Sequence, residues 1–245
     1  MKVLLIDVDS RMENLALMKV SAYHKNIGDT VELRKGLVLP NLFTDPDLVY
    51  LSCIFSWHRR QVESLIEYWD GYQILVGGTG FDPHVTLDSE VEKLKPDYSL
   101  YGQSRAVGFL SRGCPRHCPW CVVPSKEGDI YRIYYAPEVV GDKKIAIFLD
   151  NNFLFLEDYE KDLTWLAEKG TKIDFNQGMD ARIVDEKAAS LLAKCNWMSS
   201  LRFACDSLGQ IPALRRTCDL LEKYGVRPSK VFTYVLIGFD GREYP

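Results

Sequence analysis

Short apolar runs rich in valine, isoleucine and leucine recur along the whole chain, and most are followed by a stretch with helical spacing of its apolar residues. This alternation predicts βα units built around parallel sheets. Four strands are expected in the first part of the chain, over 2–8, 30–36, 48–54 and 72–78. Five more are expected in the second part, over 106–112, 144–150, 172–178, 200–206 and 231–239.

The clearest helix of the first part follows Ser56, which is a suitable N-cap residue. Its apolar positions fall at i, i+3, i+4 and i+7, on residues Val62, Leu65, Ile66 and Trp69. Such spacing places the four side chains on one face of a helix. We therefore expect a helix that packs this face against the first sheet.

Two helices of the second part carry end signals as well as apolar stripes. Asp185 stands where a helix cap is expected, just before a stripe over residues 188–195. Pro212 suits the first turn of the next helix, and Gly225 suits a left-handed residue after its end. These signals predict helices that begin after Asp185 and near Pro212.

The segment 81–105 breaks this rhythm, because it has weak periodicity, two prolines and several charged residues. Segments of this composition often separate domains. We therefore place a boundary near residue 103. Residues 1–103 are expected to form a small doubly wound, Rossmann-like α/β domain, and residues 104–245 a second series of about five βα units.

The composition of the 245 residues is 47% hydrophobic, 26% charged and 12% aromatic, which is typical of a globular protein. The longest apolar run, 231–239, is far shorter than the roughly 20 residues that span a bilayer. The first residues lack the long apolar stretch of a secretory signal, so we expect a cytoplasmic protein without a membrane segment. The net charge of −4 does not indicate nucleic-acid binding.

Four of the seven cysteines, Cys53, Cys195, Cys205 and Cys218, stand singly along the chain. Their scatter argues against a disulfide framework, and we expect them to be buried as small apolar residues. The other three lie inside the stretch GFLSRGCPRHCPWCVVPSKEG, within a span of eight residues. These are Cys114, Cys118 and Cys121.

Several chemistries suit a group of three neighbouring cysteines. A structural zinc site wants four ligands, but the next cysteine is Cys195 and His117 is adjacent to Cys118. A redox pair over CPWC would leave Cys114 unexplained, and unliganded exposed thiols would be reactive. An iron-sulfur cubane held by three thiolates, with one iron open to another ligand, uses all three. The residues favour the cubane, with zinc, a redox pair and inert thiols as the alternatives.

The stretch CPRHCPWC is a CxxxCxxC motif with an aromatic residue, Trp120, before its last cysteine, and it follows the first strand of a βα series. In these respects the chain resembles the radical S-adenosylmethionine superfamily. The resemblance implies a partial (β/α) barrel and a 4Fe-4S cluster on Cys114, Cys118 and Cys121. It also implies that the open iron binds S-adenosylmethionine, which is cleaved reductively to a 5'-deoxyadenosyl radical that acts on a substrate.

The resemblance further implies an electron donor such as flavodoxin or ferredoxin, and a set of cofactor-binding residues at the carboxyl ends of the strands. In the family, polar residues after the second barrel strand hold the methionyl amino group; many members have two glycines and a glutamate there. The residues of this chain at the corresponding places are Trp120, Asp150, Asn151, Asn152, Gln177, Arg182, Asp206, Ile237 and Gly238. Among them Arg182 is the candidate partner of the carboxylate, and Ile237 with Gly238 the candidate contact of adenine.

The family core usually has six βα units, whereas five are expected here, which suggests a fragment or a short member. The N-terminal part resembles the cobalamin-binding-type domain of one branch of the family, but the DxHxxG pattern is absent: Ala22 replaces the aspartate, and Gly28 is one residue too late. We expect His24 to be solvated at a helix end and the domain to bind no cobalamin. The alternative function is a metal-stabilised, non-enzymatic binding module or an inactive truncated relative.

Overall fold

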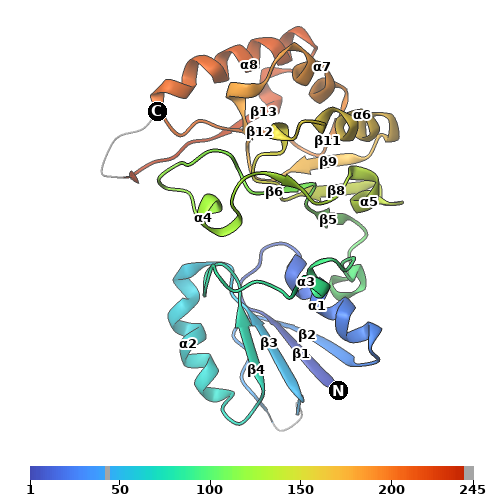
Figure 1. Ribbon diagram of the computed structural model, residues 1–245, viewed down its shortest axis with the longest axis vertical. Coiled ribbons are helices and arrows are strands. Elements are labelled where there is room, and N and C mark those ends of the chain that lie inside the picture. The colour runs from blue at the N-terminus through green and yellow to red at the C-terminus, as the bar shows by residue number, and fades with distance from the viewer. Residues whose placement is uncertain (42–44, 240–245) are drawn as a thin grey trace. The chain divides into compact units, whose positions relative to one another are not determined.

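The computed structural model describes residues 1–41 and 45–239 (Figure 1). Its contacts divide the chain into two compact units, Met1–Gln103 and Ser104–Pro245. Both units are mixed α/β structures built on parallel sheets. Among the described residues no helix is long and apolar enough to cross a membrane.

The N-terminal unit contains one sheet of four parallel strands in the order β2-β1-β3-β4. The strands are β1 (Lys2–Asp7), β2 (Thr30–Lys35), β3 (Leu48–Ser52) and β4 (Ile74–Gly77). The helices are α1 (Leu15–Asn26), α2 (Arg59–Tyr68) and the short α3 (Ser89–Glu92). The chain reverses direction across the sheet between β1 and β3, as in a doubly wound fold.

Strand β1 is buried on both faces, because successive side chains point to opposite sides of a sheet. Val3 and Leu5 pack in a cluster that includes α1, while Leu4 and Ile6 pack in a cluster that includes α2 and Trp69. The two helices therefore cover opposite faces of the sheet (Figure 1).

The apolar face predicted for α2 is confirmed, since Val62, Leu65 and Trp69 are buried. The prediction that Ser56 is the N-cap of α2 is wrong. Ser56 opens a 3-10 turn, Ser56–His58, and α2 begins only after this turn, without a side-chain cap. The extra turn separates the serine hydroxyl from the first amides of the α-helix.

The expectation of a solvated His24 is also wrong. Only 2% of the residue is exposed, because the last turn of α1 packs against the sheet. Its Nδ1 lies 2.7 Å from Asp29 Oδ2, and its Nε2 lies 3.1 Å from the hydroxyl of Tyr50. His24 is therefore a structural residue of the N-terminal unit.

The C-terminal unit contains two parallel sheets, in the orders β11-β9-β8-β5 and β10-β12-β13. The strands of the first are β5 (Ala106–Gly108), β8 (Ile145–Phe148), β9 (Lys172–Phe175) and β11 (Asn196–Trp197). Those of the second are β10 (Met179–Asp180), β12 (Leu201–Ala204) and β13 (Val231–Tyr234). A separate antiparallel pair joins β6 (Ser111–Arg112) to β7 (Tyr131–Arg132).

The segment 172–180 joins the two sheets, because β9 belongs to one and β10 to the other. We expected a single strand over 172–178, but the strand ends at Phe175. Gly178 has a φ of +140°, outside the range of strand backbone. This turn redirects the chain so that Met179 and Asp180 pair with β12.

Helices form a layer beside these strands, and consecutive helices pack on one another (Figure 1). They are α5 (Ala136–Val140), α6 (Tyr159–Lys169), α7 (Glu186–Lys194) and α8 (Ile211–Lys223). The cap predicted at Asp185 is confirmed, since its side chain accepts a 2.8 Å hydrogen bond from the amide of Ala188. Pro212 lies in the first turn of α8, and Gly225 has a φ of +89°, as expected.

Aromatic side chains fill the core between helices and strands of this unit. Phe175 stacks on Phe148 and on Phe153, with ring centroids 4.9 and 4.6 Å apart. All three side chains are almost completely buried. This packing fixes the segment that follows β8, from which the polar residues 150–152 project.

All seven cysteines are free thiols. Cys53, Cys195 and Cys205 are buried, as the sequence predicts. Cys218 is only half-buried, which corrects that prediction, because it lies at the margin of the apolar face of α8.

Candidate functional site: the cysteine loop

The three clustered cysteines lie in the loop between β6 and β7, which we call the cysteine loop (residues 113–130). It contains the short helix α4 (Val123–Glu127). The β6–β7 pairing closes the base of this loop, and the amide of Cys114 donates a 3.1 Å hydrogen bond to the carbonyl of Gly128. The two ends of the loop are therefore held together by backbone contacts.

Gly113 permits this close approach. Its φ is +78°, and a Cβ at this position would lie 2.1 Å from the carbonyl oxygen of Asp129. No other residue fits there without moving the backbone. The glycine before the first cysteine is thus a requirement of the loop's shape.

Asp150 anchors the entry to the loop. Only 4% of the residue is exposed. Its carboxylate accepts hydrogen bonds from the amide of Leu110 at 3.1 Å, and from the amide and hydroxyl of Ser111 at 2.5 and 2.6 Å. Burial raises the pKa of Asp150 to about 6, against the lowering effect of these hydrogen bonds. The carboxylate that we expected at the methionyl amino group therefore contacts the backbone of the segment that leads into the loop.

Asn151 anchors the other end of the loop through Glu127, the last residue of α4. The Asn151 Nδ2 group donates a 2.7 Å hydrogen bond to Glu127 Oε2, which also accepts from the amide of Gly113 at 2.9 Å. The second oxygen of Glu127 pairs with Arg112 Nη2 at 2.7 Å. One carboxylate thus connects both ends of the cysteine loop to residue 151.

Asn152 reaches the first cysteine itself. Its Nδ2 lies 3.4 Å from Cys114 Sγ, and the amide of Arg116 lies 3.5 Å from the same sulfur. The amide of Val123 lies 3.4 Å from Cys121 Sγ. Cys114 is half-buried, whereas Cys121 is exposed. Two of the three sulfurs, those of Cys114 and Cys121, therefore accept N–H groups.

Cys118 lies in a mixed electrostatic environment. Burial raises the pKa of its thiol, and the positive charge of Arg182 opposes this effect, while Cys121, Cys114 and Asp206 add to it. Burial likewise raises the pKa of Asp206, again opposed by Arg182. The folded chain therefore brings Arg182 and Asp206, from the ends of two other strands, within electrostatic range of this cysteine.

The guanidinium of Arg182 is held by Asp180, a residue that our sequence reasoning missed. Arg182 Nε and Nη2 lie 2.7 and 2.8 Å from the two carboxylate oxygens, and Arg116 Nε lies 3.0 Å from the second of these. These contacts keep the pKa of Asp180 below its ordinary value despite burial. Asp180 thus connects Arg116 of the cysteine loop to Arg182.

The remaining predicted residues differ in their surroundings. Trp120 packs edge to face with Phe239, with ring centroids 5.4 Å apart, so the cysteine loop meets the segment after β13. Gly238 in that segment has a φ of +75°. Ile237 is 78% exposed, and Gln177 is exposed as well. The structure therefore brings Asn152 to Cys114, and Arg182 and Asp206 within electrostatic range of Cys118.

Sequence reasoning also missed Glu127 and Ser111 as partners of the predicted residues. Glu127 carries a local signal, because it ends a short helix inside the cysteine motif stretch. Ser111 and Asp180 carry none, since their importance depends on contacts with Asp150 and Arg116, which lie 39 and 64 residues away.

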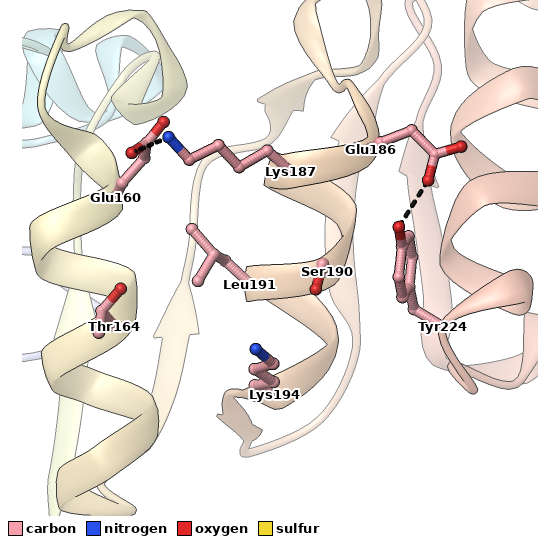
Figure 2. Close-up of a pocket in the computed structure, with 8 residues that line it drawn as sticks. All are labelled: Glu160, Thr164, Glu186, Lys187, Ser190, Leu191, Lys194 and Tyr224. Carbon is pink, nitrogen blue, oxygen red and sulfur yellow. Dashed lines mark hydrogen bonds and ion pairs between the residues drawn. The ribbon is translucent and has the colours of Figure 1, made fainter.

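A hollow on the helix layer is separate from the cysteine loop. It lies between α6, α7 and the residue that follows α8 (Figure 2). Lys187 pairs with Glu160, and the hydroxyl of Tyr224 donates a 2.5 Å hydrogen bond to Glu186. The two carboxylates of the hollow, Glu160 and Glu186, thus each have a partner within it. A second hollow near the amino-terminal ends of β8 and β9 is lined by several lysines, Lys143, Lys144, Lys169 and Lys172.

Within residues 1–41 and 45–239, no group of three or more histidine, cysteine, aspartate or glutamate side chains is arranged to hold a metal ion. Comparison with protein-family models finds no match, and comparison with curated proteins finds no relative. The chemistry of the cysteine loop is therefore inferred from its own residues and contacts.

Proposed function

We propose that the C-terminal unit is a radical S-adenosylmethionine enzyme that holds a 4Fe-4S cluster on Cys114, Cys118 and Cys121. The observation that carries this proposal is the single loop that bears all three cysteines beside the carboxyl ends of parallel strands, with N–H groups directed at two of the sulfurs. The substrate is the part of the proposal for which the chain offers no specific chemistry.

The residues of the loop fit a cluster by their donor chemistry. Thiolates are the ligands that iron-sulfur clusters take, and hydrogen bonds to the sulfurs are typical of such sites. A single metal ion draws its ligands around one centre, whereas a four-iron cluster takes one thiolate per iron. Three thiolates in one loop thus suit a cluster with one iron left for another ligand.

When bound, such a cluster would supply the electron for reductive cleavage of S-adenosylmethionine, the chemistry that generates a 5'-deoxyadenosyl radical. Asp150 and Asn151 hold the loop in position. Arg182, which is paired with Asp180, provides positive charge beside Cys118, which favours a carboxylate bound there. Arg116 pairs with the same Asp180 carboxylate. Trp120 shields one side of the loop by its contact with Phe239.

The proposal extends to the architecture. We interpret β5, β8, β9 with β10, β12 and β13 as the strands of a partial barrel, and the parallel pairing within both sheets supports this interpretation. The strand order β2-β1-β3-β4 is compatible with a cobalamin-binding-type domain in the N-terminal unit, in which the ligating motif is absent. An electron donor such as flavodoxin or ferredoxin, and a cytoplasmic location that keeps the thiols reduced, complete the proposal.

The alternative is a metal that serves only to stabilise a binding module or an inactive relative. A structural metal is needed where the protein cannot fix its loop by other means. Here Asp150, Asn151 and Glu127 fix the loop through protein hydrogen bonds. These contacts favour a cluster that is used for chemistry.

Anaerobic reconstitution with iron and sulfide tests the proposed function. We expect about four irons per chain and release of 5'-deoxyadenosine when S-adenosylmethionine and a strong reductant are added. Cys114→Ala should lose both the iron and the product but keep the circular dichroism of the folded chain. Cys218→Ala, which changes a half-buried cysteine on α8, is the matched control and should keep both. Tightly bound zinc without deoxyadenosine would refute the proposal.

A further inference from the structure

We infer that Asn152 is a positioning residue of the cluster site, which raises the reduction potential of the cluster by donating its side-chain N–H to the sulfur of Cys114. This inference rests on the proposed function. It assigns Asn152 to the cluster, in place of the contact with the methionyl amino group that the resemblance implies.

The position of Asn152 is tightly constrained. Only 5% of the residue is exposed. The next residue, Phe153, is 1% exposed and stacks on Phe175, while the preceding residue, Asn151, is bonded to Glu127. Both neighbours thus hold the backbone, and the short Asn152 side chain places its Nδ2 3.4 Å from Cys114 Sγ.

The other N–H groups directed at the cysteine sulfurs have a different origin. The donors from Arg116 to Cys114 and from Val123 to Cys121 are backbone amides, each two residues after its cysteine. Such contacts come with the loop conformation itself. Asn152 brings a side-chain donor from the end of another strand, so a substitution can remove this donor without altering the loop's backbone.

The orientation of the amide suits an iron-bound sulfur, which can accept a hydrogen bond but cannot donate one. A thiol can donate to a carbonyl, but a thiolate or an iron-bound sulfur cannot. In the structure the NH₂ group of Asn152 faces the sulfur, while its Oδ1 is buried without a partner among the described residues. The side chain therefore presents its donor to Cys114 even though its own acceptor goes unpaired.

The expected effect on the cluster follows from charge. Reduction adds one negative charge, which spreads onto the sulfurs, and a hydrogen bond to a sulfur stabilises the reduced state more than the oxidised state. Removal of the Asn152 N–H group should lower the ratio of reduced to oxidised cluster about tenfold at a fixed solution potential. For a one-electron couple this corresponds to a midpoint about 59 mV more negative.

The test compares Asn152→Leu with Asn151→Leu in the full chain after anaerobic reconstitution. The two substitutions are identical and adjacent, but Asn151 contacts Glu127 and not a sulfur. Iron content is measured first, and the midpoint potential is then measured by a redox titration followed by electron paramagnetic resonance. Asn151→Leu measures how far the loss of a loop anchor by itself shifts the potential, and we expect a clearly more negative potential in Asn152→Leu. An equal shift in the two variants would overturn the inference.

Asn152→Asp is the second variant, which keeps the shape of the side chain and replaces the donor with a negative charge. It should lower the potential at least as far as Asn152→Leu does. Equal potentials in the wild-type protein and a loaded Asn152 variant would overturn the inference. If neither variant holds the cluster while Asn151→Leu does, Asn152 is a structural residue of the loop and the inference is also wrong. Failure of the wild-type chain to take up four irons would instead count against the proposed function.

Discussion

Replacement of Asp150 by asparagine tests the physical role of the buried carboxylate that anchors the cysteine loop. The substituted side chain would keep its size and one acceptor oxygen for the amide of Ser111, but it would not ionise. The pH dependence of stability that belongs to this one group should therefore vanish in Asp150→Asn. The comparison needs only the apoprotein, since no iron takes part.

The size of the effect follows from the pKa. Burial raises the pKa of Asp150 from 3.8 to about 6 in the folded protein. The folded state thus holds this proton over a pH range in which the unfolded chain has released it, so stability falls as the pH rises. A pKa change of one is worth 1.36 kcal/mol, so the full effect is about 3 kcal/mol. This stabilising contribution is fully present below pH 3.8 and is lost once the pH has risen through 6.

Two measurements check this expectation. The ¹³C signal of the Asp150 carboxyl, identified by its absence in Asp150→Asn, should titrate near pH 6. Urea unfolding of both proteins from about pH 4 to about pH 7, followed by the amide signals of β8 and β9, reads the C-terminal unit alone. The free energy of unfolding of the wild-type protein, minus that of Asp150→Asn, should decrease by about 2–3 kcal/mol over this range.

A carboxyl signal that titrates near its ordinary pKa, about 4, would refute the reasoning, because it would show that the hydrogen bonds from Leu110 and Ser111 outweigh burial. Parallel stability curves for the two proteins would refute it as well. An opposite slope, with the wild-type protein gaining stability as the pH rises, would mean that Asp150 is stabilised in its charged form.

Three further predictions concern stability and are checked by urea unfolding. Gly78→Ala should cost the N-terminal unit about 3 kcal/mol, because φ is +98° and the new Cβ would lie 2.2 Å from the carbonyl oxygen of Cys53. Gly28→Ala is the control and should cost about 1 kcal/mol, because φ is +88° but the space around the new Cβ is open. Equal losses of stability in the two variants would contradict the steric argument. Asp185→Ala should cost the C-terminal unit about 1 kcal/mol through loss of its helix cap, an effect that Asp185→Asn should largely rescue. Trp69→Ala should cost about 3–5 kcal/mol, since its side chain is fully buried, and a loss below about 1 kcal/mol would show that this core can collapse around the gap.

The elements were predictable where a local pattern decides them. The continuous apolar run 3–6 is typical of a strand buried on both faces, and this is how β1 packs. Asp185 is recognisable as a cap because its partner amide is three residues away. In such cases both halves of the interaction lie in one short stretch of sequence.

Strand interruptions escaped prediction because they depend on distant contacts. One strand was expected over 106–112, yet the chain forms β5 and β6 with a break between them. The carboxylate of Asp150, which follows β8, accepts hydrogen bonds from the amides of Leu110 and Ser111 at this break. The pattern of apolar residues along 106–112 does not indicate these hydrogen bonds to Asp150.

The sequence by itself determined the alternation of strands and helices, the spacing of the three cysteines in one loop, and the position of polar residues 150–152 directly after a strand. These features are local, so neighbouring residues suffice to specify them. Only the tertiary structure decided that Asp150 turns toward Ser111 in β6, and that Asn151 and Asn152 turn toward Glu127 and Cys114 in the cysteine loop. Partners 24 to 39 residues apart meet only when the sheet forms, because hydrogen bonds are set by distance in space and not by distance along the chain.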